Sequence, residues 1–247
     1  MDLPSVQKTS KTKLSRTVSG IALAFSMYCT GCMDGPFYEL KKLNPIIREQ
    51  WRKDRERGIP LFHDRLEDYR TLQTSIRNYS DEEKARYVQV LTDTAKTETS
   101  PEIRRNIALT LAQVIDREDA LDGVLRLSQD KAEKVRMEAA KALRGSGTAK
   151  SKDALLAMAT TDKSNAVKLL AIESLGTHKT DDVKAFLTKQ LSAPSPATQH
   201  HAILALRDYT GTDLGGDVAK WKKYMNGEEV GPDEPSFIAN PLKYIWR

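Results

Sequence analysis

The chain has 247 residues, of which 39 are Lys or Arg and 34 are Asp or Glu, so its formal net charge is +5. Hydrophobic residues make up 39% and charged residues 30%, which is typical of a soluble globular protein. An aromatic content of only 6% favours helices over sheets. Two cysteines are too few for a disulfide scaffold or a four-cysteine zinc site.

The N-terminal segment, residues 1–31, has the pattern of an export signal. An uncharged stretch over residues 17–31 follows four basic residues: Lys8, Lys11, Lys13 and Arg16. This stretch is shorter than the roughly 20 residues that a helix needs to cross a bilayer. A short apolar segment behind basic residues is typical of a signal peptide, which is removed from the mature protein.

The segment ends in Cys29-Thr30-Gly31-Cys32, which resembles the lipobox of bacterial lipoproteins, where small residues precede the acceptor cysteine. Cys29 stands where that motif usually has leucine. The resemblance implies that Cys32 becomes the first mature residue and carries acyl chains, which hold a protein stably on a membrane when there are two or more. The alternatives are a secreted chain without lipid, an uncleaved anchor and a buried N-terminal helix.

The rest of the chain contains a repeated helical unit. Similar segments occupy residues 103–111, 135–143, 167–175 and 198–206, with starting points 32, 32 and 31 residues apart. Apolar residues recur in the same columns, for example Leu111, Leu143, Leu175 and Leu206. Within each segment the columns are four or eight residues apart, and this spacing places them on one helical face. Each segment follows a second amphipathic stretch, at 82–96, 120–128, 152–160 or 181–191, so the unit is a helical hairpin.

Three of the hairpins also carry an acidic and a basic residue six positions apart. These pairs are Glu98 and Arg104, Asp130 and Arg136, and Asp162 and Lys168. An acid in the turn and a base early in the second helix resembles the HEAT-repeat family, and the resemblance covers residues 80–211. It implies an all-α fold, an α-solenoid of about four hairpins, in which such pairs tie neighbouring repeats into a structural ladder. We interpret each cation as held by its own acid rather than free for nucleic acid.

The pattern divides the chain into four parts. They are a lipoprotein-type signal peptide (1–31), an N-terminal helical cap (32–79), the HEAT repeats (80–211), and a C-terminal capping helix and tail (212–247). Trp221 is expected to cover the last repeat. The apolar tail over 237–247 either folds back onto the solenoid or docks a partner. The charged run around Trp51 is either a solvated helix face or a contact with an anionic membrane surface.

The sequence contains no motif for catalysis or metal binding. Its four histidines lack the spacing of metal ligands, and no nucleophile elbow, P-loop or dinucleotide-binding glycine motif occurs. Cys32, the only cysteine of the predicted mature chain, is reserved for the lipid. We therefore expect no catalytic residue, no metal and no cofactor. The alternative is a HEAT-like enzyme accessory, or a lyase-like protein that binds a small ligand in the concave groove.

The second helices of HEAT solenoids line the concave side, so their outward-facing residues are candidates for partner binding. These candidates are Met137, Leu169, Leu170, His200, His201 and Leu204. Leu169, Leu170 and Leu204 are expected to form an exposed apolar patch. Such a patch either marks a partner site or receives the C-terminal tail.

The distribution of charge does not favour a nucleic-acid partner. Residues 1–31 hold four basic residues and one acid, which leaves 35 basic and 33 acidic residues in the rest of the chain. The sequence therefore predicts a non-catalytic scaffold for protein–protein interaction or assembly, with protein partners and no nucleic acid. It also predicts an exported lipoprotein, anchored to a membrane on the periplasmic or outer face of the cell envelope.

Overall fold

The computed structural model describes residues 43–230 of the chain. Every regular element of these residues is helical, and no strand occurs among them. The chain divides into two units, of which one ends at Leu61 and the other begins at Phe62. Within the described ranges, no helix has the length and apolar character that crossing a membrane requires. Cys32 and the tail over 237–247 lie outside the described residues.

The described part of the first unit contains one helix, α2 (Pro45–Glu56). Asn44 sets its start, because the side-chain oxygen of Asn44 accepts a hydrogen bond of 3.0 Å from the N–H of Ile46, and a proline follows in the first turn. Beyond its end, Gly58 has a φ of +72°, a left-handed conformation that glycine adopts without strain. The charged run predicted around Trp51 lies on this helix.

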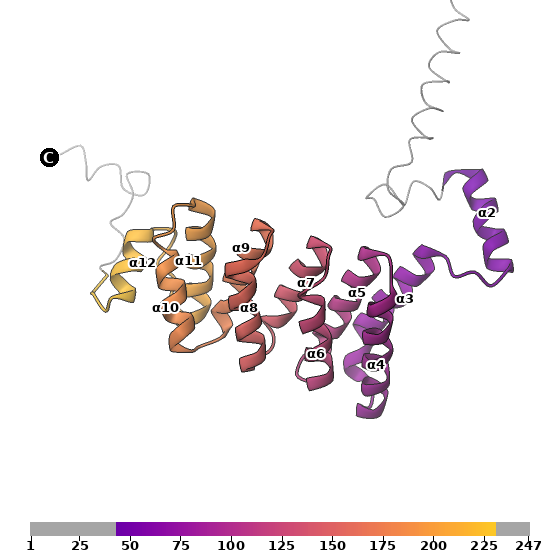
Figure 1. The fold of residues 1–247 in the computed structure, drawn as a ribbon, viewed down its shortest axis with the longest axis horizontal. Coiled ribbons are helices and arrows are strands. Elements are labelled where there is room, and N and C mark those ends of the chain that lie inside the picture. Colours follow the sequence, from indigo (N-terminus) through magenta and orange to yellow (C-terminus); the bar gives the residue numbers. More distant parts are fainter. Residues whose placement is uncertain (1–42, 231–247) are drawn as a thin grey trace, which may run out of the picture. The chain divides into compact units, whose positions relative to one another are not determined.

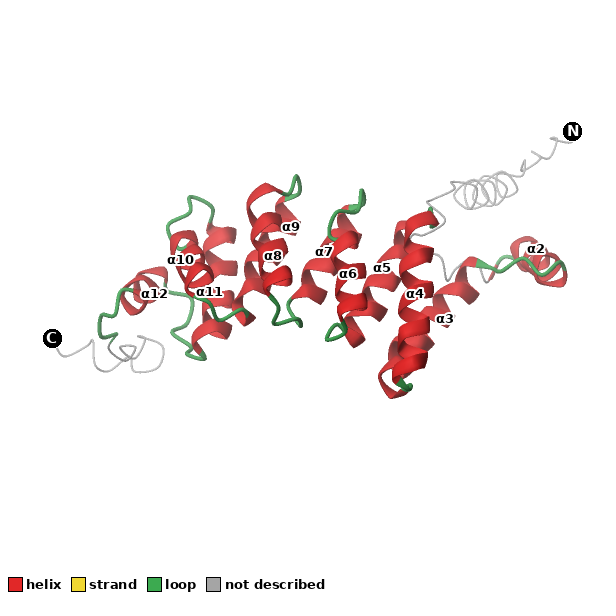
Figure 2. Ribbon diagram, turned by 60° about the horizontal axis from the view of Figure 1, so that its bottom comes forward, coloured by secondary structure: helices red, strands yellow, loops and turns green. Residues whose placement is uncertain are grey.

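The second unit is an array of helical hairpins (Figures 1 and 2). Its helices are α3 (Phe62–Ser75), α4 (Asp81–Thr97), α5 (Pro101–Leu111), α6 (Glu118–Leu127), α7 (Glu133–Leu143), α8 (Ala149–Thr161), α9 (Asn165–Ser174), α10 (Asp181–Gln190), α11 (Pro196–Thr210) and α12 (Val218–Met225). The hairpins pair α4 with α5, α6 with α7, α8 with α9 and α10 with α11. The second helices form one layer, in which α3, α5, α7, α9 and α11 contact one another in order. This arrangement confirms the predicted all-α solenoid.

Several helices of the second unit begin where a side chain satisfies free N–H groups, among them α4, α5 and α11. Ser80 and Glu83 form a reciprocal capping box, in which the Ser80 hydroxyl accepts from the Glu83 N–H at 3.3 Å and the Glu83 carboxylate accepts from the Ser80 N–H at 2.9 Å. Ser100 and Ser195 cap α5 and α11, and each precedes a proline that suits the first turn. Each such cap contributes about 1 kcal/mol, so local sequence sets where these helices start.

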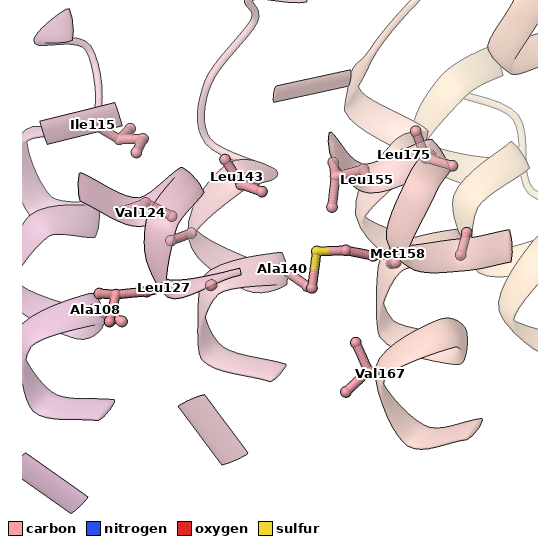
Figure 3. Close-up of a cluster of buried hydrophobic side chains, with 14 of the residues drawn as sticks. Ala108, Ile115, Val124, Leu127, Ala140, Leu143, Leu155, Met158, Val167 and Leu175 are labelled. Carbon is pink, nitrogen blue, oxygen red and sulfur yellow. The ribbon is translucent and has the colours of Figure 1, made fainter. Parts of the chain in front are cut away.

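One apolar core runs through the second unit between the two layers, and Figure 3 shows part of it. The leucine column of the repeats is fully buried, at 0% exposure, in Leu111, Leu143, Leu175 and Leu206. Burying each of these side chains stabilises the fold by about 1.5–3 kcal/mol. Small residues let neighbouring helices approach closely. A Cβ atom at Gly176 would lie 2.5 Å from the main-chain oxygen of Ala205 on α11, so a larger residue would force these elements apart.

The two ends of the array are built from different elements. At the C-terminal end, α12 packs against α11 and places Trp221 in the core with 0% exposure. The Trp221 Nε1 donates a hydrogen bond of 3.0 Å to the main-chain oxygen of Gly215, which satisfies the buried indole N–H. At the N-terminal end, α3 continues the layer of second helices one position beyond α5.

Candidate protein-interaction surface

The charged ladder forms between successive hairpins. The Arg104 guanidinium on α5 makes two parallel hydrogen bonds to the carboxylate of Asp130, at 2.6 Å from Nε and 2.9 Å from Nη2. Its third nitrogen, Nη1, donates to the main-chain oxygen of Glu98 at 2.9 Å. The Asp130 carboxylate also accepts the Ala132 N–H at 2.7 Å. One arginine therefore fastens the turn of its own hairpin to the turn of the next.

The same geometry recurs one repeat further along. Arg136 on α7 reaches the carboxylate of Asp162 at 2.7 and 2.9 Å. Its Nη1 donates to the main-chain oxygen of Asp130 at 2.8 Å, and the Asp162 carboxylate accepts the Ser164 N–H at 2.7 Å. The repetition of all four contacts makes this a property of the repeat unit.

The structure corrects the interpretation that each cation is paired with the acid of its own hairpin. The carboxylate that Arg104 binds belongs to the following turn, while the Glu98 carboxylate is bound by Arg65 of α3. The pairing is displaced because an arginine early in the second helix extends toward the next hairpin. Only its Nη1 reaches back to the turn that precedes its own helix. The ladder thus begins one helix earlier than the sequence spacing suggests.

Lys168 departs from the predicted ladder. Asp162 is occupied by Arg136, and within residues 62–230 no ion pair joins it to Lys168. The position that would supply the next carboxylate, 26 residues beyond Lys168, is Pro194. Gln199, the equivalent residue in the last hairpin, keeps only the main-chain contact, a hydrogen bond of 2.8 Å to the carbonyl six residues earlier. The rungs therefore stop at the third hairpin.

Burial makes the rungs costly to break. The side chains of Arg104 and Asp130 are only 4% and 9% exposed. Burial alone would raise the pKa of Asp130, but hydrogen bonds from Arg104 and from the Ala132 N–H outweigh it, and the pKa of Asp130 is lowered. Removing one partner of such a pair leaves an uncompensated buried charge, which costs about 3–5 kcal/mol. These arginines hold the fold together and are not available to bind phosphates.

A second set of ion pairs crosses the outer side of the second helices. Arg105 on α5 contacts Glu138 on α7 at 3.3 Å. Arg144 at the end of α7 contacts Glu173 on α9 at 3.6 Å and Asp208 on α11 at 2.6 Å. Charges of both signs therefore alternate across this surface and join its four helices.

The predicted partner-binding residues lie on this same surface, but they are less exposed than predicted. His200 is exposed, whereas the other five are half-buried: Met137, Leu169, Leu170, His201 and Leu204. The side chain of Met137 packs against the core. The His201 Nδ1 lies 2.9 Å from the Glu173 carboxylate, and the rings of His200 and His201 meet edge to face with centroids 5.7 Å apart.

The predicted leucine patch is therefore only partly exposed. Leu169, Leu170 and Leu204 are each half-buried, because α9 packs between α7 and α11 in one layer, and neighbouring helices cover residues on its flanks. In the second unit, the large hydrophobic side chains that are exposed are instead Tyr87 and Val90 on α4 and Tyr224 on α12.

A hollow between α3 and α4 is a feature that the sequence did not reveal. It has a volume of about 430 Å³ and is lined by Arg65, Asp68, Tyr69, Thr71, Leu72, Tyr79 and Tyr87. The rings of Tyr79 and Tyr87 lie 5.3 Å apart between centroids. The sequence predicts a helical cap over residues 32–79. Nothing in the sequence, however, indicates which apolar residues of α3 and α4 lack a covering helix.

The described part of the chain offers little for chemistry. No group of three or more His, Cys, Asp or Glu side chains in residues 43–230 could hold a metal ion. His178 is buried at 4% exposure, and its Nε2 has no hydrogen-bond partner among these residues. Burial and the nearby charge of Lys152 lower the pKa of His178, while a hydrogen bond to the main chain of Leu143 opposes that shift. A buried neutral histidine is a structural element here.

Comparison with protein families agrees with this architecture. The family model described as HEAT repeats matches residues 88–175 and, in a second overlapping match, residues 153–218. These matches together span more than half of the chain, and the chain belongs to the HEAT-repeat family. No curated protein matches the sequence.

Proposed function

We propose that the protein is a non-catalytic scaffold that binds a protein partner through the outer side of α7, α9 and α11. The observation that carries this proposal is the continuous layer of second helices. Its outer side combines half-buried leucines with ion pairs that join neighbouring helices. Such a mixture of apolar and paired polar groups matches the composition of transient protein interfaces. HEAT-repeat solenoids are also extended surfaces suited to protein recognition.

The disposition of the arginines favours a protein partner over a nucleic acid. Binding to phosphates requires cations that are free to replace the counterions of the nucleic acid. Arg104 and Arg136 are buried in rungs, and Arg144 already contacts two carboxylates. The net charge of +2 that remains after residues 1–31 are set aside adds no broad electrostatic attraction.

The test is binding by variants of the proposed surface. Leu170→Asp places a charge where a partner would bury an apolar side chain, and we expect it to reduce cross-linking to the partner and recovery in pull-downs. Ala157→Asp is the matched control, because Ala157 is exposed on α8 of the same hairpin but in the opposite layer. If both variants recover the partner equally while retaining the wild-type unfolding midpoint, this surface is not the binding site.

We further propose that the protein is exported and held on a membrane by a lipid on Cys32. Support comes from the basic residues, the uncharged stretch and the small residues that precede this cysteine. The intact mass of the membrane-extracted protein should correspond to a chain that starts at acylated Cys32. Cys32→Ser should abolish the lipid mass and release the protein from the membrane fraction. A mature chain that retains Met1 would contradict this assignment.

The alternative function, that of an enzyme accessory, predicts a bound small molecule instead of a protein partner. Copurification from native membranes, followed by mass spectrometry of proteins and of small molecules, separates the two functions. Recovery of a protein that Leu170→Asp releases supports the scaffold. Recovery of a small molecule that the same substitution releases, with no protein, favours ligand binding in the groove instead.

A further inference from the structure

At the N-terminal edge of the second unit, α3 lies in the layer formed by the second helices of the hairpins, but this unit supplies no first helix to pair with it. Each of α5, α7, α9 and α11 packs with the helix that precedes it in its own hairpin. By contact with α5, α3 belongs to the same layer, yet within residues 62–230 it begins the array, and no helix of this unit precedes it. The position next to α4 in the layer of first helices is therefore unfilled within this unit.

The two flanks of α4 show this difference directly. On one flank, the Thr92 methyl group lies 2.6 Å from where a Cβ atom at Gly123 would be, so α4 meets α6 in close contact there. Successive residues of a helix are rotated by about 100°, which places Tyr87 about 140° and Val90 about 160° around the helix from Thr92. Tyr87 is 38% exposed and Val90 is 56% exposed. The flank that faces away from α6 thus carries uncovered apolar side chains.

Aromatic rings wall the hollow beside this flank. Tyr69 and Leu72 of α3 line it together with Tyr79 and Tyr87. The Tyr79 hydroxyl and the Ser75 hydroxyl are hydrogen-bonded at 3.0 Å, which holds the Tyr79 ring against the side of the hollow. Tyrosine is enriched among the residues that dominate binding energy at protein interfaces, because it offers a large rigid surface.

The charge of the hollow is negative once existing contacts are taken into account. Arg65 is the only lining cation, and it is bound to the carboxylate of Glu98. Asp68 also lines the hollow, and within residues 62–230 no ion pair neutralises it. A cation placed here would lie close to a carboxylate and to tyrosine rings, whose faces attract cations.

We propose that the α3–α4 edge, defined by Asp68, Tyr69, Leu72, Tyr79, Tyr87 and Val90, is a docking site for an amphipathic helix of a partner protein. The helix takes the position that a first helix has in the other hairpins, with its apolar stripe on the tyrosines and Val90. A Lys or Arg beside that stripe faces Asp68. This is helix-in-groove recognition, in which apolar residues at positions i, i+3, i+4 and i+7 supply the contacts. The site lies apart from the surface of the proposed function, so either can be wrong without the other.

A selection experiment tests the chemistry of the occupant without assuming its identity. Full-length protein is used to select from a displayed library of random 16-residue peptides, after removal of peptides that also bind Tyr87→Ala. We expect the selected peptides to show apolar residues with helical period and a Lys or Arg beside them. Selected peptides that are acidic, proline-rich or without that period overturn the proposal, as does the absence of any peptide that depends on Tyr87.

Binding by a selected peptide then assigns the contacts. We expect Tyr87→Ala and Val90→Asp each to lower the affinity for the peptide by about tenfold or more, as for residues at the centre of an interface. Fluorescence anisotropy measures this affinity. Asp68→Asn should lower the affinity for the peptide that carries Lys, but it should not change the affinity for the same peptide with Lys→Gln. Tyr224→Ala is the matched control, because Tyr224 is 36% exposed on α12 at the other end of the array. Equal effects of Tyr87→Ala and Tyr224→Ala contradict the proposal.

Two other occupants are distinguished by a photo-cross-linking amino acid at position 87 of the full chain. A cross-link within one chain to residues 43–56 would show that the chain fills its own edge. A cross-linked homodimer, together with a sedimentation coefficient that falls on Val90→Asp, would show that a second copy fills it. Either result overturns the proposal, whereas a cross-link to the selected peptide supports it.

Discussion

The two ends of the helical array present different surfaces to their surroundings. At the C-terminal end, α12 places Trp221 in the core at 0% exposure and returns its indole N–H to the main chain. At the N-terminal end, α4 is the outermost helix in the layer of first helices, and it leaves Tyr87 and Val90 exposed beside an open hollow. A solenoid loses a neighbour at each end. Here one end is covered by the chain's own helix, and the other keeps an aromatic surface.

The largest expected effect is at the covered end. Trp221→Ala removes a fully buried ring, and we expect the free energy of unfolding to fall by about 3–5 kcal/mol because of the cavity and the lost burial. Urea unfolding followed by circular dichroism measures this change. Tyr224→Ala, on the same short helix but partly exposed, should cost much less. Comparable losses in the two variants would show that Trp221 does not close the array.

A second prediction compares a complete rung with the position where the rungs stop. Arg136→Met leaves the carboxylate of Asp162 buried at 7% side-chain exposure, and we expect a loss of about 3 kcal/mol. Lys168→Met removes a cation that has no ion pair within residues 62–230, and it should change stability by less than about 0.5 kcal/mol. Chemical denaturation of both variants checks the difference. Similar values for the two would mean that the ladder contributes no more than ordinary surface charge.

A third prediction concerns pH. The pKa of His178 is lowered from its usual value of 6.5 by burial, so as the pH falls below about 6.5 the unfolded chain takes up a proton before the folded chain does. Stability contributed by the neutral ring is therefore lost as the pH falls, with a slope of at most about 1.4 kcal/mol per pH unit. The carboxylates of Asp130 and Asp162 have lowered pKa values and lose their contribution only at more acidic pH.

The control for this pH dependence is His178→Phe, a substitution that removes the titrating group from a buried site. Urea unfolding at pH 7.5 and pH 5.5 should show a smaller difference for the variant than for the wild type. A wild-type midpoint that does not change between these two pH values would exclude His178 as the group responsible.

The smallest expected effect on stability is at the open end. Tyr87→Ala removes a side chain that is 38% exposed, and we expect the free energy of unfolding to change by less than about 0.5 kcal/mol. The same substitution is expected to abolish most peptide binding. Peptide affinity should therefore change strongly while the free energy of unfolding hardly changes. A large loss of stability in this variant would mean that Tyr87 belongs to the fold rather than to a binding site.

Much of the fold could be predicted from periodicity because it depends on local sequence. The columns of Leu111 and Leu143 are buried as their spacing predicts, and serine caps such as Ser100 begin their helices. The ladder shows where this stops. Six residues separate Asp130 and Arg136, yet the partner of Arg136 is 26 residues away. Sequence spacing identified the residues but not which turn each arginine would face.

The candidate sites could be predicted less well, because exposure depends on which helices become neighbours. Leu169 and Leu170 have the positions of surface residues on a single helix, but packing between α7 and α11 half-buries them. Tyr87 shows the opposite outcome, because it is exposed although it is an aromatic residue of an amphipathic helix. Its exposure follows from the position of α6, which covers the other flank of α4. Neither outcome follows from periodicity along one helix.

The geometry of the rungs has a consequence for how the length of this protein can change. Each arginine uses one main-chain oxygen behind it and one carboxylate ahead of it, as Arg104 and Arg136 both do. The hairpins α4–α5 and α6–α7 thus each carry a carboxylate that receives the arginine before it and an arginine that reaches the carboxylate after it. A hairpin equivalent to α6–α7 can be inserted or removed between α5 and α8 without leaving an unmatched charge, because stability in such arrays depends on adjacent repeats. The lack of a carboxylate at Pro194 marks the position where no further rung of this kind can be added.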